Sequence, residues 1–185
     1  MVGRAIQYLL HHPDTAFVYS DLLINGPSTP ERISDRTNVP YSGVEEQLGV
    51  LNELGSLTSG DDTTWSVLSP VKNSEHRESF TLTLIAVIGA STRNDDITRF
   101  LNDYDLPLLS RAVQATYDYI DGTTTRRGIA HTLDITPAAA IAISQIVEDI
   151  ITVFNASGHI DRELPAATGV PVKHTGTPFV LDSND

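Results

Sequence analysis

The chain contains Ile24-Asn-Gly-Pro-Ser-Thr-Pro-Glu-Arg-Ile-Ser-Asp-Arg-Thr-Asn-Val-Pro40, and a second stretch, Ile120-Asp-Gly-Thr-Thr-Thr-Arg-Arg-Gly-Ile-Ala-His-Thr-Leu-Asp-Ile-Thr136, follows 96 residues later (Gly122 minus Gly26). Each copy reads as a helix, a glycine stop, a short capped helix, a turn and a further helix. This order is the helix-turn-helix arrangement, whose last helix enters the major groove in DNA-binding proteins. The repeat therefore points to a nucleic-acid regulator rather than an enzyme. Its aligned pairs are Ile24 with Ile120, Gly26 with Gly122, Thr29 with Thr125, Ile33 with Ile129, and Val39 with Ile135.

The composition describes an acidic, cysteine-free protein that is long enough to bury a core. Its 185 residues include 24 Asp+Glu against 12 Lys+Arg, a formal net charge of −12. Only Lys72 and Lys173 are lysines. Acid excess with scarce lysine is typical of proteins from halophilic archaea, whose charged surfaces stay soluble when salt screens repulsion. An acidic protein needs a local basic patch to bind a polyanion.

The first half predicts helices near 4–12, 15–25, 29–37 and 41–54. Pro13, Gly26 and Gly55 act as breaks, and Ser28-Thr29-Pro30-Glu31 supplies a cap with proline in the first turn. Two β-prone runs follow within 57–68 and predict a hairpin. The pattern predicts a mainly α fold with a small β-wing: a winged helix-turn-helix over 1–70.

The second half predicts a helical domain that contains a degenerate helix-turn-helix-like unit. Residues 71–79 read as a polar connector and 80–154 as a dimerisation or regulatory domain. Phe80 to Thr83 alternates like a strand, while 84–90 fits either a buried helix or a strand. Helices are expected after Asn94, from Leu106 to Ile120, over 124–132, and from Thr136-Pro137 to about Phe154. Residues 155–185 are expected to be an extended or disordered tail.

The first half resembles the winged-helix domains of ArsR- and MarR-like bacterial and archaeal regulators. The resemblance rests on the stretch from Gly26 to Val44 and on Leu51-Asn-Glu-Leu-Gly55. The second half resembles a domain that follows such winged helices in haloarchaeal proteins of unassigned role. This resemblance rests on Asn94-Asp-Asp-Ile, Tyr117-Asp-Tyr-Ile-Asp-Gly-Thr, Arg127, Ala130, Leu133-Asp134 and Pro137. The two resemblances imply a transcription regulator.

If the first unit docks in the usual way, the start of the helix at 41–54 faces base edges. A glutamine can pair with adenine, a serine with either base, and a glutamate can accept from the cytosine amino group. Arginines on the preceding helix can contact phosphates and fix the register. The predicted DNA-binding residues are Arg32, Arg36, Tyr41, Ser42, Glu45, Glu46 and Gln47. The predicted wing contains two aspartates and no basic residue, unlike the basic wing typical of the family.

The third helix of the second copy is rich in alanine and isoleucine, and such a helix is normally buried. We expect it to form a core helix or the seam of a homodimer. The predicted dimer-interface residues are Ala138, Ala139, Ile141, Ala142 and Ile146. Arg126, Arg127 and His131 beside it are expected to pair with nearby aspartates.

The sequence offers no catalytic or metal-binding motif, so no cofactor is expected. We expect a cytoplasmic homodimer that binds double-stranded DNA and has no membrane segment, and the sequence leaves open whether an effector exists. The competing hypothesis is an acidic adaptor that uses its winged helix for protein contacts alone, with Glu45 and Glu46 on a solvated acidic face.

Overall fold

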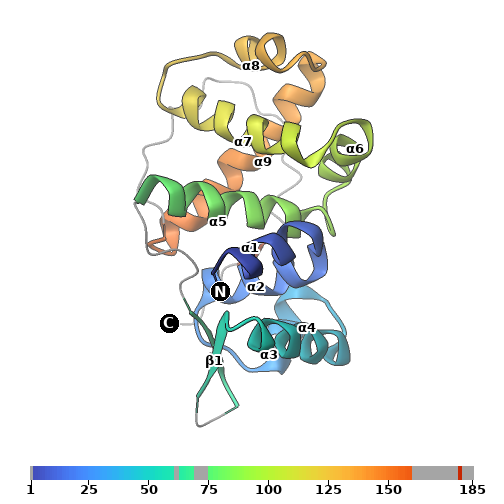
Figure 1. Ribbon diagram of the computed structural model, residues 1–185, viewed down its shortest axis with the longest axis vertical. Helices are drawn as coiled ribbons and strands as arrows, with labels where there is room; N and C mark the ends of the chain where they lie inside the picture. Colours follow the sequence, from blue (N-terminus) through green and yellow to red (C-terminus); the bar gives the residue numbers. More distant parts are fainter. Residues whose placement is uncertain (1, 61–62, 69–74, 160–178, 181–185) are drawn as a thin grey trace.

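The computed structural model describes residues 2–60, 63–68, 75–159 and 179–180. The described part of the chain is mainly helical, with one small antiparallel sheet (Figure 1). In chain order the elements are α1 (Val2–His11), α2 (Pro13–Asn25), α3 (Pro30–Thr37), α4 (Tyr41–Glu53), β1 (Leu57–Ser59), β2 (Trp65–Val67), α5 (Glu75–Ala90), α6 (Asp95–Asp103), α7 (Leu106–Ile120), α8 (Arg126–Leu133) and α9 (Pro137–Ala156).

The repeat expected from the sequence is present in the helix bounds and in the turn conformations. The short helices α3 and α8 both have eight residues and lie 96 positions apart, as do the first residues of α4 and α9. Thr29 and Thr125 cap the short helices through their side chains. Asn38 and Asp134, also 96 apart, both take the left-handed conformation, with φ of 52° and 55°. We call α2–α3–α4 with the hairpin the first unit, and α7–α8–α9 the second unit.

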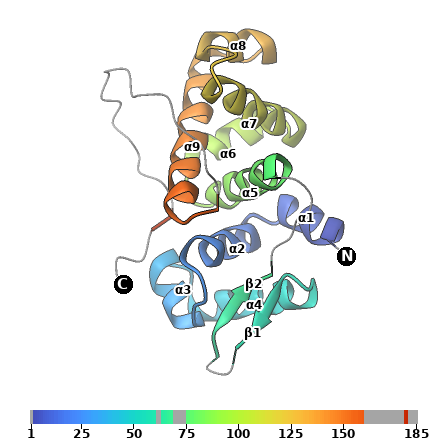
Figure 2. The same cartoon turned by 90° about the vertical axis from the view of Figure 1, so that its left-hand side faces the viewer.

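The hairpin predicted within 57–68 is confirmed as the β1–β2 pair. Its register joins Leu57 to Val67 and Ser59 to Trp65. Ser28, which precedes α3, makes a further antiparallel bridge to Trp65 and so ties the hairpin to the connection between α2 and α3. Figure 2 shows the hairpin beside α4 at the lower end of the molecule. Asp61 and Asp62, the predicted wing acids, lie outside the described residues.

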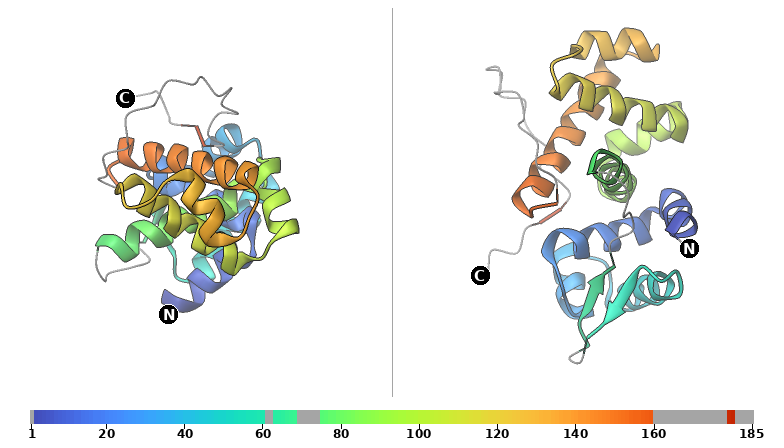
Figure 3. Two further views of the ribbon diagram at one scale, coloured as in Figure 1. Left: turned by 90° about the horizontal axis from the view of Figure 1, so that it is seen from above. Right: turned by 60° about the vertical axis from the view of Figure 1, so that its left-hand side comes forward.

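Helix α5 lies between the two units and packs against α1, α2, α7 and α9 (Figure 3, right). The prediction of a strand at 80–83 is wrong, because these residues belong to α5. The helix begins at Glu75, inside the predicted connector. Since neighbours cover α5 on several sides, its residues 82–90 are all buried, and apolar alternation carries no strand signal in such a helix.

The hydrophobic core is continuous from Leu9 to Phe179 and includes side chains of both units. Helix α9 is long and apolar enough to cross a membrane by length and composition, but half of its apolar window is buried inside the protein. It packs against α5, α6, α7 and α8 as a core helix.

Phe179, which belongs to the stretch predicted to be an extended or disordered tail, contributes to this core. Phe179 is 3% exposed, and its ring centroid lies 5.2 Å from that of Phe17 on α2. The side chain of Asn25 donates to the carbonyl of Val180 at 2.9 Å. The C-terminal residues 179–180 therefore pack on the first unit.

Candidate nucleic-acid interface

The start of α4 is held outward by the way in which α3 and α4 are connected. Ile33 anchors α3 in the core with no exposed surface. Asn38 reverses the chain in its left-handed conformation, and Pro40 opens α4. Val44, Leu48 and Leu51 then bury one face of α4, as the apolar spacing predicts. The opposite face of its first two turns is consequently turned to solvent.

Four of the residues predicted to face DNA are exposed on that surface. Tyr41 and Ser42 begin α4, and Glu45 and Glu46 follow one turn later. The Glu45 carboxylate accepts a hydrogen bond from the Tyr41 hydroxyl and raises the pKa of Tyr41 above its usual range, and the charges of Glu45 and Glu31 act in the same direction. Tyr41 therefore stays a neutral hydrogen-bonding group at physiological pH.

Gln47 does not share this orientation. It is half-buried, and its side-chain carbonyl accepts a hydrogen bond from the hydroxyl of Thr15 on α2. Bidentate pairing with adenine needs both the carbonyl and the amino group of a glutamine. The expectation that Gln47 reads adenine is therefore corrected, because its carbonyl is already used inside the protein.

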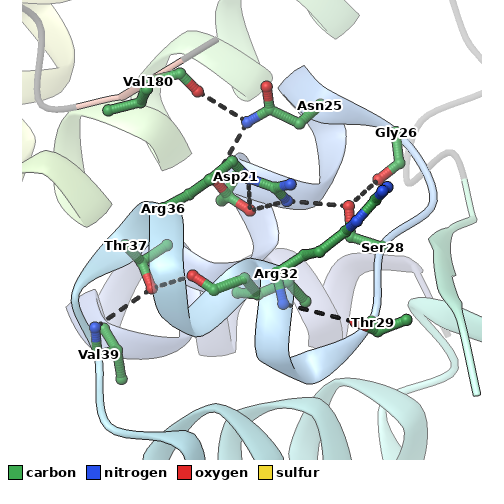
Figure 4. A network of polar contacts seen from close by, with 11 residues as sticks. Asp21, Asn25, Gly26, Ser28, Thr29, Arg32, Arg36, Thr37, Val39 and Val180 are labelled. Carbon is green, nitrogen blue, oxygen red and sulfur yellow. Dashed lines mark hydrogen bonds and ion pairs between the residues drawn. The ribbon is translucent and has the colours of Figure 1, made fainter. Parts of the chain in front are cut away.

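Arg32 and Arg36 lie one turn apart on α3 but have different surroundings. Arg32 is exposed, and its side chain extends toward Ser28 and Gly26 (Figure 4). Arg36 forms an ion pair with Asp21 at 2.7 Å and also donates to the hydroxyl of Ser28 at 2.9 Å (Figure 4). The Arg36 and Asp21 side chains are 7% and 2% exposed. The predicted phosphate contact by Arg36 is therefore corrected, because its guanidinium holds α3 to α2.

Over the described residues of α3 and α4, the exposed charges are mostly negative. Arg32 is accompanied by exposed carboxylates on both helices: Glu31, Asp35, Glu45, Glu46 and Glu53. Any nucleic acid that approaches this surface meets one cationic side chain among five carboxylates. Close contact with phosphates therefore depends on Arg32 and on the polar groups at the start of α4.

The predicted dimer residues on α9 separate into three groups. Ile146 is buried in the protein's own core, so its assignment to an interface is wrong. Ala139 and Ala142 line a pocket, to which Ala138 also contributes, together with Phe100 of α6 and Tyr104, the residue that follows α6. Ala138 and Ile141 are exposed, Ile141 by 46%. The first turns of α9 thus face outward like those of α4, so α9 is a core helix only in its later turns, and a homodimer seam at Ala138 and Ile141 stays a prediction.

The basic residues beside α9 are only partly free. Arg126 forms an ion pair with Glu148 at 2.7 Å and lies 5.2 Å from the ring centroid of Tyr119. This agrees with the expected pairing to an acidic residue, although the partner is a glutamate. Arg127 and His131 are exposed.

Two structural contacts of the first unit could not be identified from the sequence. Asp21 interrupts the apolar stripe of α2, and a buried acid in such a position indicates a partner without naming it. Arg93 belongs to the turn between α5 and α6 and donates to the carbonyls of Thr37 and Asn38, which lie more than 50 residues earlier. No local pattern connects residues that are so far apart in the chain.

Residues 91–156, which include α6 to α9, match a family of unknown function, DUF7437. The match leaves the first unit, α1 and α5 outside its bounds. The chain matches no curated protein and no solved structure. Among the described residues, no group of three or more His, Cys, Asp or Glu side chains is arranged to hold a metal ion.

Proposed function

We propose that this protein is a sequence-specific, DNA-binding transcription regulator that acts as a homodimer. In this proposal the first unit is a winged helix-turn-helix, α4 enters the major groove, and β1–β2 is the wing. The observation that supports it most directly is the outward, polar start of α4, which follows a fixed turn, with Arg32 exposed on the preceding helix α3. The order of α2, α3, α4 and the hairpin, with the Ser28–Trp65 bridge, supports the assignment of the module.

Ser42 and Glu46 are the side chains that we expect to read base edges. A serine hydroxyl can donate or accept, and a carboxylate accepts from the amino group of cytosine. Arg32 is expected to bind a phosphate and so to fix the position of α4 along the groove.

The sparse positive charge predicts an unusual salt dependence. A homodimer that contacts phosphates through Arg32 alone neutralises two charges, so log K should fall against log salt with a slope of about −2. A slope this shallow lets binding persist at high salt. This matches the acidic, lysine-poor composition of the chain.

The test is a binding selection from random duplex DNA at molar salt, followed by affinity measurements on the enriched sequence. We expect a palindromic motif, because a two-fold dimer reads two equivalent half-sites. Arg32→Ala should weaken binding to every sequence and flatten the salt slope, whereas Glu46→Ala should relax preference at one base position. Arg99→Ala is the matched control, since Arg99 is an exposed arginine on α6. Unchanged affinity and slope in Arg32→Ala would reject the proposed docking.

The second candidate function is an acidic protein-interaction adaptor. The excess of carboxylates over Arg32 on α3 and α4 favours it, because such a surface attracts a basic partner. Under this alternative the selection enriches no DNA sequence. A basic protein instead co-purifies with the chain, and the double variant Glu45→Lys with Glu46→Lys releases it.

A further inference from the structure

The turn between α3 and α4 is held by side chains at three successive carbonyls. Arg93 donates from Nη2 to the carbonyl of Thr37 at 2.8 Å and to that of Asn38 at 3.1 Å. Ser34 donates its hydroxyl to the carbonyl of Val39 at 2.6 Å. The next carbonyl, that of Pro40, accepts from the amides of the first turn of α4. The guanidinium of Arg93, from the turn between α5 and α6, therefore binds the last carbonyl of α3 and the carbonyl of the turn residue Asn38, two residues before Pro40.

Arg93 is itself held in place by the segment that contains it. Its amide donates to the carbonyl of Ala90 at 2.9 Å, which closes the end of α5. Its guanidinium lies 5.7 Å from the ring centroid of Phe17, a geometry that favours a cation–π contact. Phe17 is buried and also contacts Phe179. A cation at this position is further favoured because the C-terminal end of a helix carries partial negative charge.

The second unit provides an internal comparison. The positions equivalent to Ser34 and Thr37, 96 residues later, are Ala130 and Leu133, whose side chains cannot donate hydrogen bonds. The turn before α9 is closed by backbone bonds, including Ile135 N–H to the carbonyl of Ala130 at 3.1 Å. The two turns share their left-handed residue, but only the first has hydrogen-bonding side chains at these positions. The additional bonds occur in the unit whose third helix presents polar side chains.

We propose that Arg93 is a positioning residue for α4: it fixes the turn at Thr37 and Asn38, so that the C-terminal half of the chain sets the orientation of Tyr41, Ser42 and Glu46. This inference rests on the proposed function, because it assigns a regulatory connection to the same DNA-facing surface. A change at the α5–α6 turn would reach α4 through one guanidinium. Lysine can replace the charge of Arg93 but not the planar group that binds two carbonyls while it stacks on a ring.

The experiment compares full-length Arg93→Met, Arg93→Lys and Arg99→Met by amide hydrogen exchange and by affinity for the selected duplex. Arg93→Met should accelerate exchange at residues 38–44 by about tenfold or more, because a charge-assisted hydrogen bond is lost, while α7 and α8 keep their wild-type exchange. Arg93→Met should also weaken DNA binding by about tenfold, because the reading side chains are no longer preorganised. Arg93→Lys should restore both properties in part, and Arg99→Met should change neither.

The outcomes separate this inference from the proposed function. Unchanged exchange at 38–44 in Arg93→Met overturns the positioning role, even if DNA binding falls. Equal acceleration in all helices also overturns it, because that is the result of a general loss of stability. If the wild-type protein binds no duplex at all, the proposed function fails, while the exchange data still decide whether Arg93 holds the turn.

Discussion

At the scale of single residues, the pair of Asp21 and Arg36 is the polar contact on which the first unit depends most. Both side chains are almost fully buried, and Arg36 also binds Ser28. Removal of one partner leaves an uncompensated buried charge, which costs about 3–5 kcal/mol. Arg36→Met should therefore lower the free energy of unfolding by roughly that amount, measured by denaturant titration at constant salt. The exposed Asp96–Arg99 pair is the control, and Arg99→Met should cost at most about 1 kcal/mol.

The double variant Asp21→Leu with Arg36→Met makes this prediction sharper. Replacing both partners by apolar side chains removes the isolated charge, so the double variant should be more stable than either single variant. If the double variant loses as much free energy of unfolding as the two single variants together, the pair matters through packing rather than through charge.

Arg32 and Arg36 also show where prediction from sequence ends at this scale. They are four positions apart on α3, which places them on a similar side of the helix. Their different environments depend on Asp21, an acid on another helix that precedes Arg36 by 15 residues. The capped starts of the short helices and the turns that follow them depend only on neighbouring residues, so the sequence indicated those local features correctly, whereas the left-handed conformation of Asn38 and Asp134 is a finding of the structure.

At the scale of elements, the crossing of α2 and α5 depends on a glycine. A Cβ atom at Gly89 would lie 2.7 Å from the backbone nitrogen of Phe17, closer than real contacts allow. Gly89→Ala should therefore separate the helices and cost about 1–3 kcal/mol. Gly49→Ala on the exposed side of α4 is the matched control, because nothing lies within 4 Å of its added Cβ. It should raise stability by about 0.5–1 kcal/mol.

Thermal unfolding of the two glycine variants gives the measurement. If Gly89→Ala proves as stable as the wild type, α2 and α5 must be able to separate without loss, and the tight crossing has no role in stability.

Helix α5 also explains which elements the sequence could not specify. Capped helices such as α3, α6 and α8 begin where a hydroxyl or amide side chain binds the first amides, so their starts can be read locally. A helix that is buried on several sides has no polar face, so its sequence lacks the amphipathic pattern of a surface helix. In α5 the alternation of apolar and polar residues at 80–83 therefore resembles the pattern of a strand. The identity of α5 depends on the neighbours that cover it, which are other parts of the same chain.

At the scale of the whole molecule, the continuous core predicts that both units unfold together. Ile33 and Ile129 occupy equivalent positions in the repeat and are both fully buried. Truncation of either to alanine should cost about 2–5 kcal/mol. Because α5 packs against helices of both units, each substitution should shift one common transition, seen alike by Trp65 fluorescence in the hairpin and by circular dichroism of the helices. Two separate transitions, with Ile129→Ala moving the helical signal but not the Trp65 signal, would instead show that the units are independent domains.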